Sequence, residues 1–556
     1  MDHKDAFTTE TEGLPEASSP SVVRLYDGDV FDLGIYPVRK RIGDAEVRML
    51  GYNGSIPGPT LHVDQGSEII VQVENKGDVE ATVHWHGLRL QNLYDGVPQE
   101  TQASIQPGER FTYKLRFPDP GLYWYHPHIR EDFAQEMGLY APIIVEPSDP
   151  SYWPHVHRQM TITLDDVLIE DGRIVPFSRS GPTFTAMGRF GNVMLINGES
   201  EFSGQAVAGE IVRLYLVNTA NTRIFNFALR GARMKLIGGD SGRYEREAFV
   251  DEVLLSPSER AVVDVLFDAP GDVPLEHRTP DHTYDLGVFS VEGTATRDTV
   301  GSFGELRTDP ELTTERVLIE HDLEREPDKV LSIVASMPLL YGGEAQAASS
   351  YVCPMHPEVT STSPGTCPKC GMKLVPSDAL PASASDQHEG HAHGEHDLSG
   401  HEHGGHDHGD HGDHGDGLEW EDLMPEINRQ TDPTNMIWKL VDRETGAENH
   451  AISWSFTVGD RVKIRLINEM DSDHPMHHPF HIHGAGRFLI LSRDGRPEPN
   501  LVWKDTVLLH AGETVDILLY VTNPGLWMAH CHIAEHIEGG MMFSFNVAPS
   551  SEWGEH

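Results

Sequence analysis

The chain has 556 residues, of which 87 are acidic and 42 basic, so its formal net charge is −45. This charge argues against nucleic acids and anionic membrane surfaces as partners. No apolar run reaches the roughly 18 residues that a membrane span needs. Only 11 of the basic residues are lysine, and so acidic and lysine-poor a composition is typical of halophilic proteins. The N-terminus, MDHKDAFTTETEGLPEASSP, lacks the apolar core of a signal peptide, so we expect a cytoplasmic protein or a mature form.

Three segments share one pattern, in which a Gly-led turn opens an alternating strand that ends near an Asn: residues 66–78, 209–221 and 459–471. A second strand follows each of them, starting near residues 107, 257 and 511. Short alternating strands between Gly, Pro and Asn turns predict antiparallel β-sandwiches. We therefore expect an all-β chain with three copies of one sandwich, over residues 22–148, 158–322 and 327–550.

Histidine pairs mark the first of these domains. HWHG supplies His84 and His86, and YHPH supplies His126 and His128. Residues two apart on a strand point to the same face, so each pair can serve one site. The corresponding stretch of domain two, DLGVFSVEG, has no histidine. We expect domain two to be a structural spacer or wall.

Residues 342–417 interrupt domain three, because LSIVASMPLL and MIWKLVDRETG on either side still have the pattern of its strands. Residues 351–376 resemble the small heavy-metal-binding domain attached to copper-exporting ATPases and efflux adaptors. The candidate ligands form a Cys₃His set: Cys353, His356, Cys367 and Cys370. The thioethers of Met355 and Met372 favour Cu(I) over Zn as the bound metal. A structural zinc knuckle is the alternative.

Residues 385–417 form the second part of this insertion. Ten histidines lie between residues 388 and 414, among Gly, Asp and Glu. Such a low-complexity segment cannot bury a core, so we expect it to be disordered. Loose metal collection is its predicted role, and an inert acidic tether is the alternative.

The last two clusters lie in domain three. HPFHIHG supplies His478, His481 and His483, and PGLWMAHCHI aligns without gaps on PGLYWYHPHI of domain one. His530 and His532 fall on the YHPH histidines, and Cys531 falls on a proline. Side chains alternate along a strand, so Cys531 points away from its two neighbours. One strand is then predicted to serve two metal sites, and a buried free cysteine beside surface histidines is the alternative.

Together the four motifs resemble the multicopper oxidases, which include three-domain laccases and bacterial cuprous oxidases. The resemblance implies three cupredoxin-like Greek-key sandwiches that hold four copper ions. It assigns the mononuclear (type 1, blue) site to His478, Cys531, His536 and the weak axial ligand Met541. It assigns the single (type 2) copper of a trinuclear cluster to His84 and His481. It assigns the coupled (type 3) pair to His86, His126, His128, His483, His530 and His532. Dioxygen is the implied acceptor.

Reduction of dioxygen to water also needs protons. Asp95 lies nine residues after His86 and matches the carboxylate that the family places beside the trinuclear cluster, although a loop-capping aspartate would fit its YDG context. The family often has an acid directly after the last copper histidine, where this chain has Ile537. Glu535 or Glu538 could take its place.

The motifs leave several candidates for the reductant. In cuprous oxidases a Met-rich segment occupies a similar part of domain three, so the insertion looks like a functional replacement for it. Met476 matches a Cu(I) ligand of that subfamily, Asp473 neighbours the matching acidic position, and Met337 is a possible second thioether. Cu(I) oxidation for copper resistance is the favoured function, and we expect a monomer that is located in the periplasm or secreted as a mature form. The alternatives are a laccase acting on phenols or aromatic amines, an Fe(II) or Mn(II) oxidase, and a copper-storage protein.

The charge generates a first prediction. Because a net charge of −45 creates self-repulsion that dissolved ions screen, the melting temperature should rise between low and molar salt. Differential scanning fluorimetry in NaCl and KCl series measures it. An unchanged melting temperature would contradict the halophilic interpretation.

Overall fold

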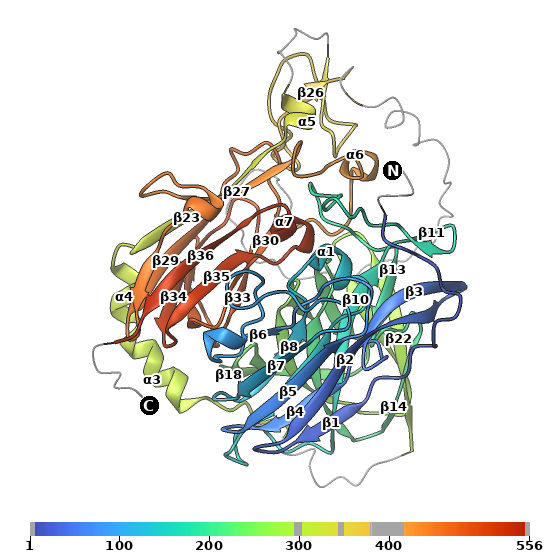
Figure 1. Cartoon of the computed structure of the whole chain (residues 1–556). Helices are drawn as coiled ribbons and strands as arrows, with labels where there is room; N and C mark the ends of the chain where they lie inside the picture. Colours follow the sequence, from blue (N-terminus) through green and yellow to red (C-terminus); the bar gives the residue numbers. More distant parts are fainter. Residues whose placement is uncertain (1–5, 294–302, 343–349, 378–379, 381–415, 551–556) are drawn as a thin grey trace, which may run out of the picture.

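The computed structural model describes residues 6–293, 303–342, 350–377, 380 and 416–550. Three β-sandwiches make up the body of the molecule, and a small yellow lobe stands above the third of them (Figure 1). This architecture confirms the expected all-β, cupredoxin-like fold. No helix in these ranges is long and apolar enough to cross a membrane.

Domain one consists of two sheets and two short helices. One sheet contains, in order, β1 (Val22–Leu25), β4 (Thr60–Asp64), β9 (Ala141–Glu146), β8 (Gly121–His126) and β6 (His84–His86). The other contains β3 (Ala45–Tyr52), β2 (Val30–Ile42), β5 (Glu68–Asn75) and β7 (Arg110–Arg116). The helices are η1 (Asn92–Tyr94) and α1 (Glu131–Ala134).

Domain two repeats this plan. Its larger sheet contains β13 (Val193–Ile196), β10 (Arg158–Val167), β15 (Ile211–Asn218), β20 (Arg260–Leu266), β17 (Arg233–Gly239) and β18 (Gly242–Val250). Its second sheet contains β14 (Phe202–Val207), β22 (Thr283–Glu292), β21 (Gly271–Arg278), β16 (Phe225–Leu229) and β19 (Val253–Leu255). A separate hairpin joins β11 (Ile169–Glu170) and β12 (Arg173–Ile174).

Domain three carries the insertion. One sheet contains β27 (Ile437–Asp442), β23 (Lys329–Ser336), β29 (Arg461–Asn468), β34 (Thr514–Val521), β31 (Gly486–Arg493) and β32 (Arg496–Pro497). The other contains β28 (Ser455–Thr457), β36 (Met542–Ala548), β35 (Gly525–Cys531), β30 (His478–Ile482) and β33 (Thr506–Leu509). Its short helices are α5 (Pro338–Tyr341), α6 (Pro425–Asn428), η3 (Asn449–Ala451) and α7 (Ala534–Glu538).

The repeated strand pairs are present in every copy, since β5 pairs with β7, β15 with β20, and β29 with β34, all antiparallel. The expectation of purely antiparallel sandwiches is wrong, because β2 runs parallel to β5, β10 to β15, and β23 to β29. Greek-key connections bring strands that are distant in sequence side by side, and side-chain alternation along one strand does not reveal its neighbour's direction.

A structural asparagine explains why the repeated strand ends as it does. Asn75, Asn218 and Asn468 are all buried. Each side-chain amide donates hydrogen bonds to two backbone carbonyls from separate loops. In domain three these carbonyls belong to Met476 and His510. The amide therefore fixes the loop that leads into the histidine strand β30.

The connection between domains two and three packs on the third. It contains α3 (Pro310–Leu318) and α4 (Glu320–Glu324), and Asp309 caps α3 by accepting hydrogen bonds from two backbone N–H groups. Leu312 and Ile319 lie in one apolar cluster with Leu489 and Leu518 of domain three. The expected end of domain two, residue 322, falls within α4.

The insertion leaves and re-enters between adjacent strands. β23 pairs directly with β27, with Ser336 opposite Ile437, so the described residues between them add no strand to this sheet. Inside the insertion β25 (Thr360–Ser361), β24 (Tyr351–Val352) and β26 (Val375–Pro376) form a three-stranded sheet. Residues 385–415 of the predicted His-rich segment lie outside the described residues.

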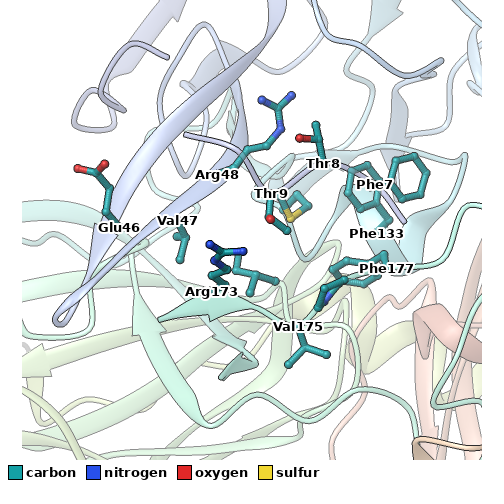
Figure 2. A pocket seen from close by; sticks show the side chains of 13 residues that line it. Phe7, Thr8, Thr9, Glu46, Val47, Arg48, Phe133, Arg173, Val175 and Phe177 are labelled. Atoms are coloured by element: carbon teal, nitrogen blue, oxygen red, sulfur yellow. The ribbon is translucent and has the colours of Figure 1, made fainter. Parts of the chain in front are cut away.

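The N-terminal segment ties domain one to domain two. Phe7 stacks on Phe133 of α1 with ring centroids 4.0 Å apart, and its N–H donates to the Phe177 carbonyl. Figure 2 shows the small pocket that these residues line together with Arg48 and Arg173. None of its lining residues is a histidine or cysteine. The contacts of Phe7 therefore link α1 of domain one to the Phe177 segment of domain two.

Candidate metal centres

Two paired strands position both predicted copper sites. β30 runs antiparallel to β35, with Phe480 opposite Cys531 and His481 opposite His530. Domain one repeats this register between β6 and β8, with His84 opposite His126. Alternation along β35 sends Cys531 to one side of the sheet and His530 to the other, as the sequence predicted.

The mononuclear site forms around Cys531. Its Sγ lies 3.5 Å from His478 Nδ1 and 3.7 Å from His536 Nδ1, and all three residues are fully buried. Met541 is also buried, its carbonyl accepts from the Cys531 N–H, and its own N–H donates to the His536 carbonyl. The Cys, His₂ and Met combination is the blue-copper ligand set.

Burial leaves this donor set in need of a cation. It raises the pKa of the Cys531 thiol and lowers the pKa of His478 and His536. The imidazoles are therefore neutral and able to donate lone pairs, whereas the thiol needs a metal to become a thiolate. Two neutral imidazoles and a metal-activated thiolate fit a copper ion.

All eight histidines predicted for the trinuclear cluster gather at the interface of domains one and three, and each is buried. Rings from the two domains pair across this interface: His86 lies 3.8 Å from His481 and His84 lies 4.1 Å from His483, between ring centroids. Burial is the main cause that lowers the pKa of these ligands: His86, His126, His128, His481, His483, His530 and His532.

Hydrogen bonds select which ring nitrogen faces the cluster. His84 Nδ1 donates to the Asp95 carbonyl at 2.7 Å, and His481 Nδ1 donates to the Asp505 carbonyl at 2.8 Å. Both Nε2 atoms are buried without a hydrogen-bond partner. The His86 ring has the opposite orientation: its Nε2 forms a hydrogen bond with the Asp505 carboxylate, and its Nδ1 has no hydrogen-bond partner. A buried lone pair without a partner is costly, and a metal ion would satisfy each of these.

One contact within the cluster makes the need for a cation explicit. His483 Nδ1 donates to Asp95 and His530 Nδ1 donates to the Cys531 carbonyl, so both Nε2 atoms carry lone pairs. These two Nε2 atoms lie 3.0 Å apart, and His128 Nε2 lies 3.3 Å from His483 Nε2. Facing lone pairs repel unless a cation lies between them. The residues present fit the predicted copper cluster.

Asp95 lies where the resemblance placed it. Its Oδ2 accepts from His483 Nδ1 at 2.7 Å, and its Oδ1 lies 3.4 Å from His84 Nδ1. Burial alone would raise the pKa of this carboxyl, but the two histidines together hold it well below its usual range. An ionised Asp95 therefore joins a ligand of the predicted single copper to one of the coupled pair.

Sequence reasoning missed Asp505 and Arg260. Asp505 accepts from His86 Nε2 at 3.0 Å and from both terminal nitrogens of Arg260 at 2.7 and 2.5 Å. Arg260 belongs to domain two, so that domain is more than a spacer: it places a buried positive charge behind the cluster. Comparing the loops around YDG and KDT in the two terminal domains would have indicated Asp505, whereas nothing local in domain two indicates Arg260.

The two glutamates predicted as proton donors lie at the junction of the three domains. Glu535 accepts from Thr222 Oγ1 of domain two at 3.2 Å, and Glu538 accepts from the Glu131 N–H at 2.9 Å. Burial raises the pKa of both glutamates to about 7. Glu131, which the sequence analysis missed, lies 3.2 Å from His128 Nδ1 and connects this group to the cluster.

The insertion holds the predicted Cys₃His cluster intact. Cys353 Sγ lies 3.6 Å from Cys370 Sγ and 3.8 Å from His356 Nδ1, and Cys367 Sγ lies 3.7 Å from the same nitrogen. Bonds of about 2.0 Å to nitrogen and 2.3 Å to sulfur would place these atoms at angles of about 100–120° around one ion. The Cys370 hydrogen bond lowers the pKa of Cys353 to about 5. This is the geometry of a tetrahedral soft-metal site.

The three predicted substrate residues belong to domain three, beside the insertion or within the same apolar core. Met337 and Met476 are fully buried in the apolar cluster that also contains Cys353 and Cys531. Asp473 is already engaged, because Oδ1 pairs with Lys373 at 2.8 Å and Oδ2 accepts from the Met337 N–H at 3.0 Å.

Comparisons with known proteins agree with this geometry. Three family models described as "Multicopper oxidase" match residues 37–150, 161–273 and 423–551, and a "Heavy metal binding domain" model matches residues 350–377. The chain is 25% identical to "Multicopper oxidase MmcO" of Mycobacterium tuberculosis, over 91% of this chain and 84% of that relative. It is 26% identical to "Laccase-7" of Arabidopsis thaliana, over 89% and 88%.

A solved multicopper oxidase from Campylobacter jejuni superposes with a TM-score of 0.63 at 19% identity, covering 98% of this chain and 99% of that one. Fold and sites thus define a copper protein that couples a blue site to a histidine-rich cluster. The chain belongs to the multicopper oxidase family. It is an oxidoreductase that uses dioxygen as acceptor.

Replacing the thiolate ligand tests the mononuclear site. Cys531→Ser should remove the blue colour and one copper equivalent, because no other cysteine lies between two such histidines and a methionine. Absorption spectra and copper analysis measure this outcome, with Cys370→Ser as the control that stays blue. A Cys531→Ser protein that remained blue would refute the assignment.

Domain two's contribution is tested at Arg260. Arg260→Met leaves the buried Asp505 carboxylate unpaired, so it should destabilise the protein by about 3–5 kcal/mol and reduce copper in the trinuclear cluster while the blue site is retained. Arg233→Met is the control, since its partly exposed pair with Asp268 contributes about 0–1 kcal/mol. Urea unfolding and copper analysis provide the readouts. Equal destabilisation by both changes would contradict a special role for Arg260.

Proposed function

We propose that this multicopper oxidase takes its electrons from Cu(I) and that its physiological role is copper resistance. The observation that carries the proposal is the position of the insertion. Its Cys353, Cys367 and Met372 are buried in one apolar cluster with Cys531, Met476 and Trp438 of the blue-site region. The metal-binding domain also contacts this region directly, because Met372 touches His474, whose ring lies 5.9 Å from that of Trp438.

Access to the blue-site histidines supports a small reductant. His478 and His536 have no exposed surface, and Trp438 packs on both, with ring centroids at 4.6 and 4.5 Å. Trp438 is itself 1% exposed. A phenol would need to reach an imidazole edge and finds it covered. A single metal ion needs only a succession of ligands.

Suitable ligands line this approach. The Cys₃His cluster could hold one ion, and the thioethers of Met337 and Met476 are buried in the apolar cluster that also contains Cys353 and Cys531. We assign Cu(I), rather than Zn, to the Cys₃His cluster because Met355 and Met372 are buried beside it and soft ligands select Cu(I). Ligands tethered next to a site raise the local metal concentration.

We propose four coppers in the sandwiches, one at Cys531 and three among the eight histidines. When bound, they supply one-electron transfer at the first site and four-electron reduction of dioxygen to water at the cluster. The chain connects the two sites covalently, because Cys531 is flanked by His530 and His532. Arg260 and Asp505 hold His86 in place, and Asp95 holds His483 and faces His84.

Oxygen uptake tests the proposal. Rates with Cu(I), Fe(II) and a phenol are compared for the whole chain and for a variant that lacks residues 345–415. Loss of this domain should lower the Cu(I) rate and raise the phenol rate, because it removes metal ligands and also removes Met372 from His474, the neighbour of Trp438. Deletion of residues 385–415 alone is the matched control and should leave the phenol rate unchanged.

The blue absorption of each variant shows whether domain three has stayed folded. An undiminished Cu(I) rate in a blue deletion variant would contradict the proposal. A whole chain that oxidises phenols faster than Cu(I) would favour a laccase, the activity named in one of the relatives.

A further inference from the structure

The loop that follows Cys370 of the Cys₃His cluster contacts domain three. Met372 follows Cys370 by two residues, and its carbonyl accepts from the Cys367 N–H at 2.7 Å, which closes the loop. Gly371 between them has φ +76°, and a Cβ there would lie 2.3 Å from Met470 Cε. The positive φ of Gly371 therefore favours glycine, and the short distance shows that the loop lies against the Met470 side chain of domain three.

This docked loop presents a thioether to a buried imidazole. Met372 Sδ lies 3.3 Å from His474 Nδ1, and neither residue has exposed surface. Ion pairing of Lys373 with Asp473 and a hydrogen bond from the Tyr341 hydroxyl to the Lys373 carbonyl hold the two segments together. The pair thus joins two parts of the chain that are about a hundred residues apart in sequence.

The spacing of the two atoms suits a shared ion. Bonds of about 2.3 Å to sulfur and 2.0 Å to nitrogen would meet at an angle of about 100° at the observed separation. A thioether with an imidazole is a soft donor pair that favours Cu(I) over hard or divalent ions. The same apolar cluster contains further buried thioethers, among them Met337 and Met476.

His474 also lies next to the blue site. Its ring centroid is 5.9 Å from that of Trp438, the ring that packs on both His478 and His536. An electron leaving a metal at His474 would therefore cross a single aromatic ring to reach either histidine ligand. The Cys₃His cluster, by contrast, makes no ring contact with Trp438 among the described residues.

We propose that Met372 and His474 together form a Cu(I) relay site between the Cys₃His cluster and the blue copper. This inference rests on the proposed function and specifies where its substrate is oxidised. One Cu(I) held there loses one electron to the oxidised blue copper and leaves as Cu(II), which prefers harder ligands. Four such events supply the four electrons that reduce one O₂, with four protons, to two waters.

Silver(I) is the probe for binding, because it is as soft as Cu(I) and is not oxidised. Crystals of the copper-loaded whole chain are soaked in silver nitrate, and anomalous density is expected between Met372 Sδ and His474 Nδ1. Met372→Leu keeps the bulk and should lose this peak. Met424→Leu, at another buried methionine of the same apolar cluster, should retain it. Silver at the Cys₃His cluster alone would overturn the proposal.

Turnover separates this inference from the proposed function. Met372→Leu and His474→Gln should each raise the Cu(I) concentration for half-maximal oxygen uptake about tenfold or more, with the blue absorption and the rate with a ferrocene donor unchanged. Wild-type Cu(I) kinetics in both variants would remove the relay and leave the proposed function standing. No Cu(I) oxidation by the wild type would refute the proposed function, while the silver peak would still decide whether the site exists.

Discussion

The pairing of β30 with β35 is the constraint on which the rest of the structure depends. Its register places Phe480 opposite Cys531 and His481 opposite His530, and the pleat sends adjacent side chains to opposite faces. A shift of one residue would move the thiolate into the histidine cluster and the imidazoles into the apolar core. The buried Asn468 amide fixes the loop that enters β30, so a feature of the sandwich repeat also secures the metal chemistry.

The three-domain assembly follows from the cost of burying charge. Eight imidazoles at one interface leave unpaired nitrogens, and Asp95 and Asp505 supply acceptors that orient them. Asp505 in turn needs a counter-charge, which Arg260 provides from domain two. Domain two has no ligand in the cluster, yet without its guanidinium a carboxylate beside the cluster would be buried alone. This dependence couples copper binding to the packing of all three domains.

The insertion changes what can reach the blue site without altering the site itself. Since β23 and β27 pair directly, the sandwich is complete without it. Its metal-binding domain nevertheless shares an apolar cluster with Cys531 and contacts His474, the neighbour of Trp438, through Met372. A module of this kind lets one scaffold accept a different reductant, because electron entry depends on what contacts the edges of His478 and His536. The histidine cluster predicted for dioxygen reduction lies on the opposite face of β35.

Motif spacing, together with the family resemblance that the motifs carry, predicted the candidate copper ligands, the three sandwiches and the Cys₃His cluster, because these depend on strand alternation and on short-range ligand spacing. It also identified Asp95 and two glutamates at the domain junction. Only the tertiary structure revealed the parallel strand pairs, Asp505 with Arg260, Glu131 beside His128, and the contact of Met372 with His474. Except for Glu131, which lies only three residues from His128, each of these joins residues from separate domains or distant segments, and the pattern of one strand carries no information about the partner it will meet.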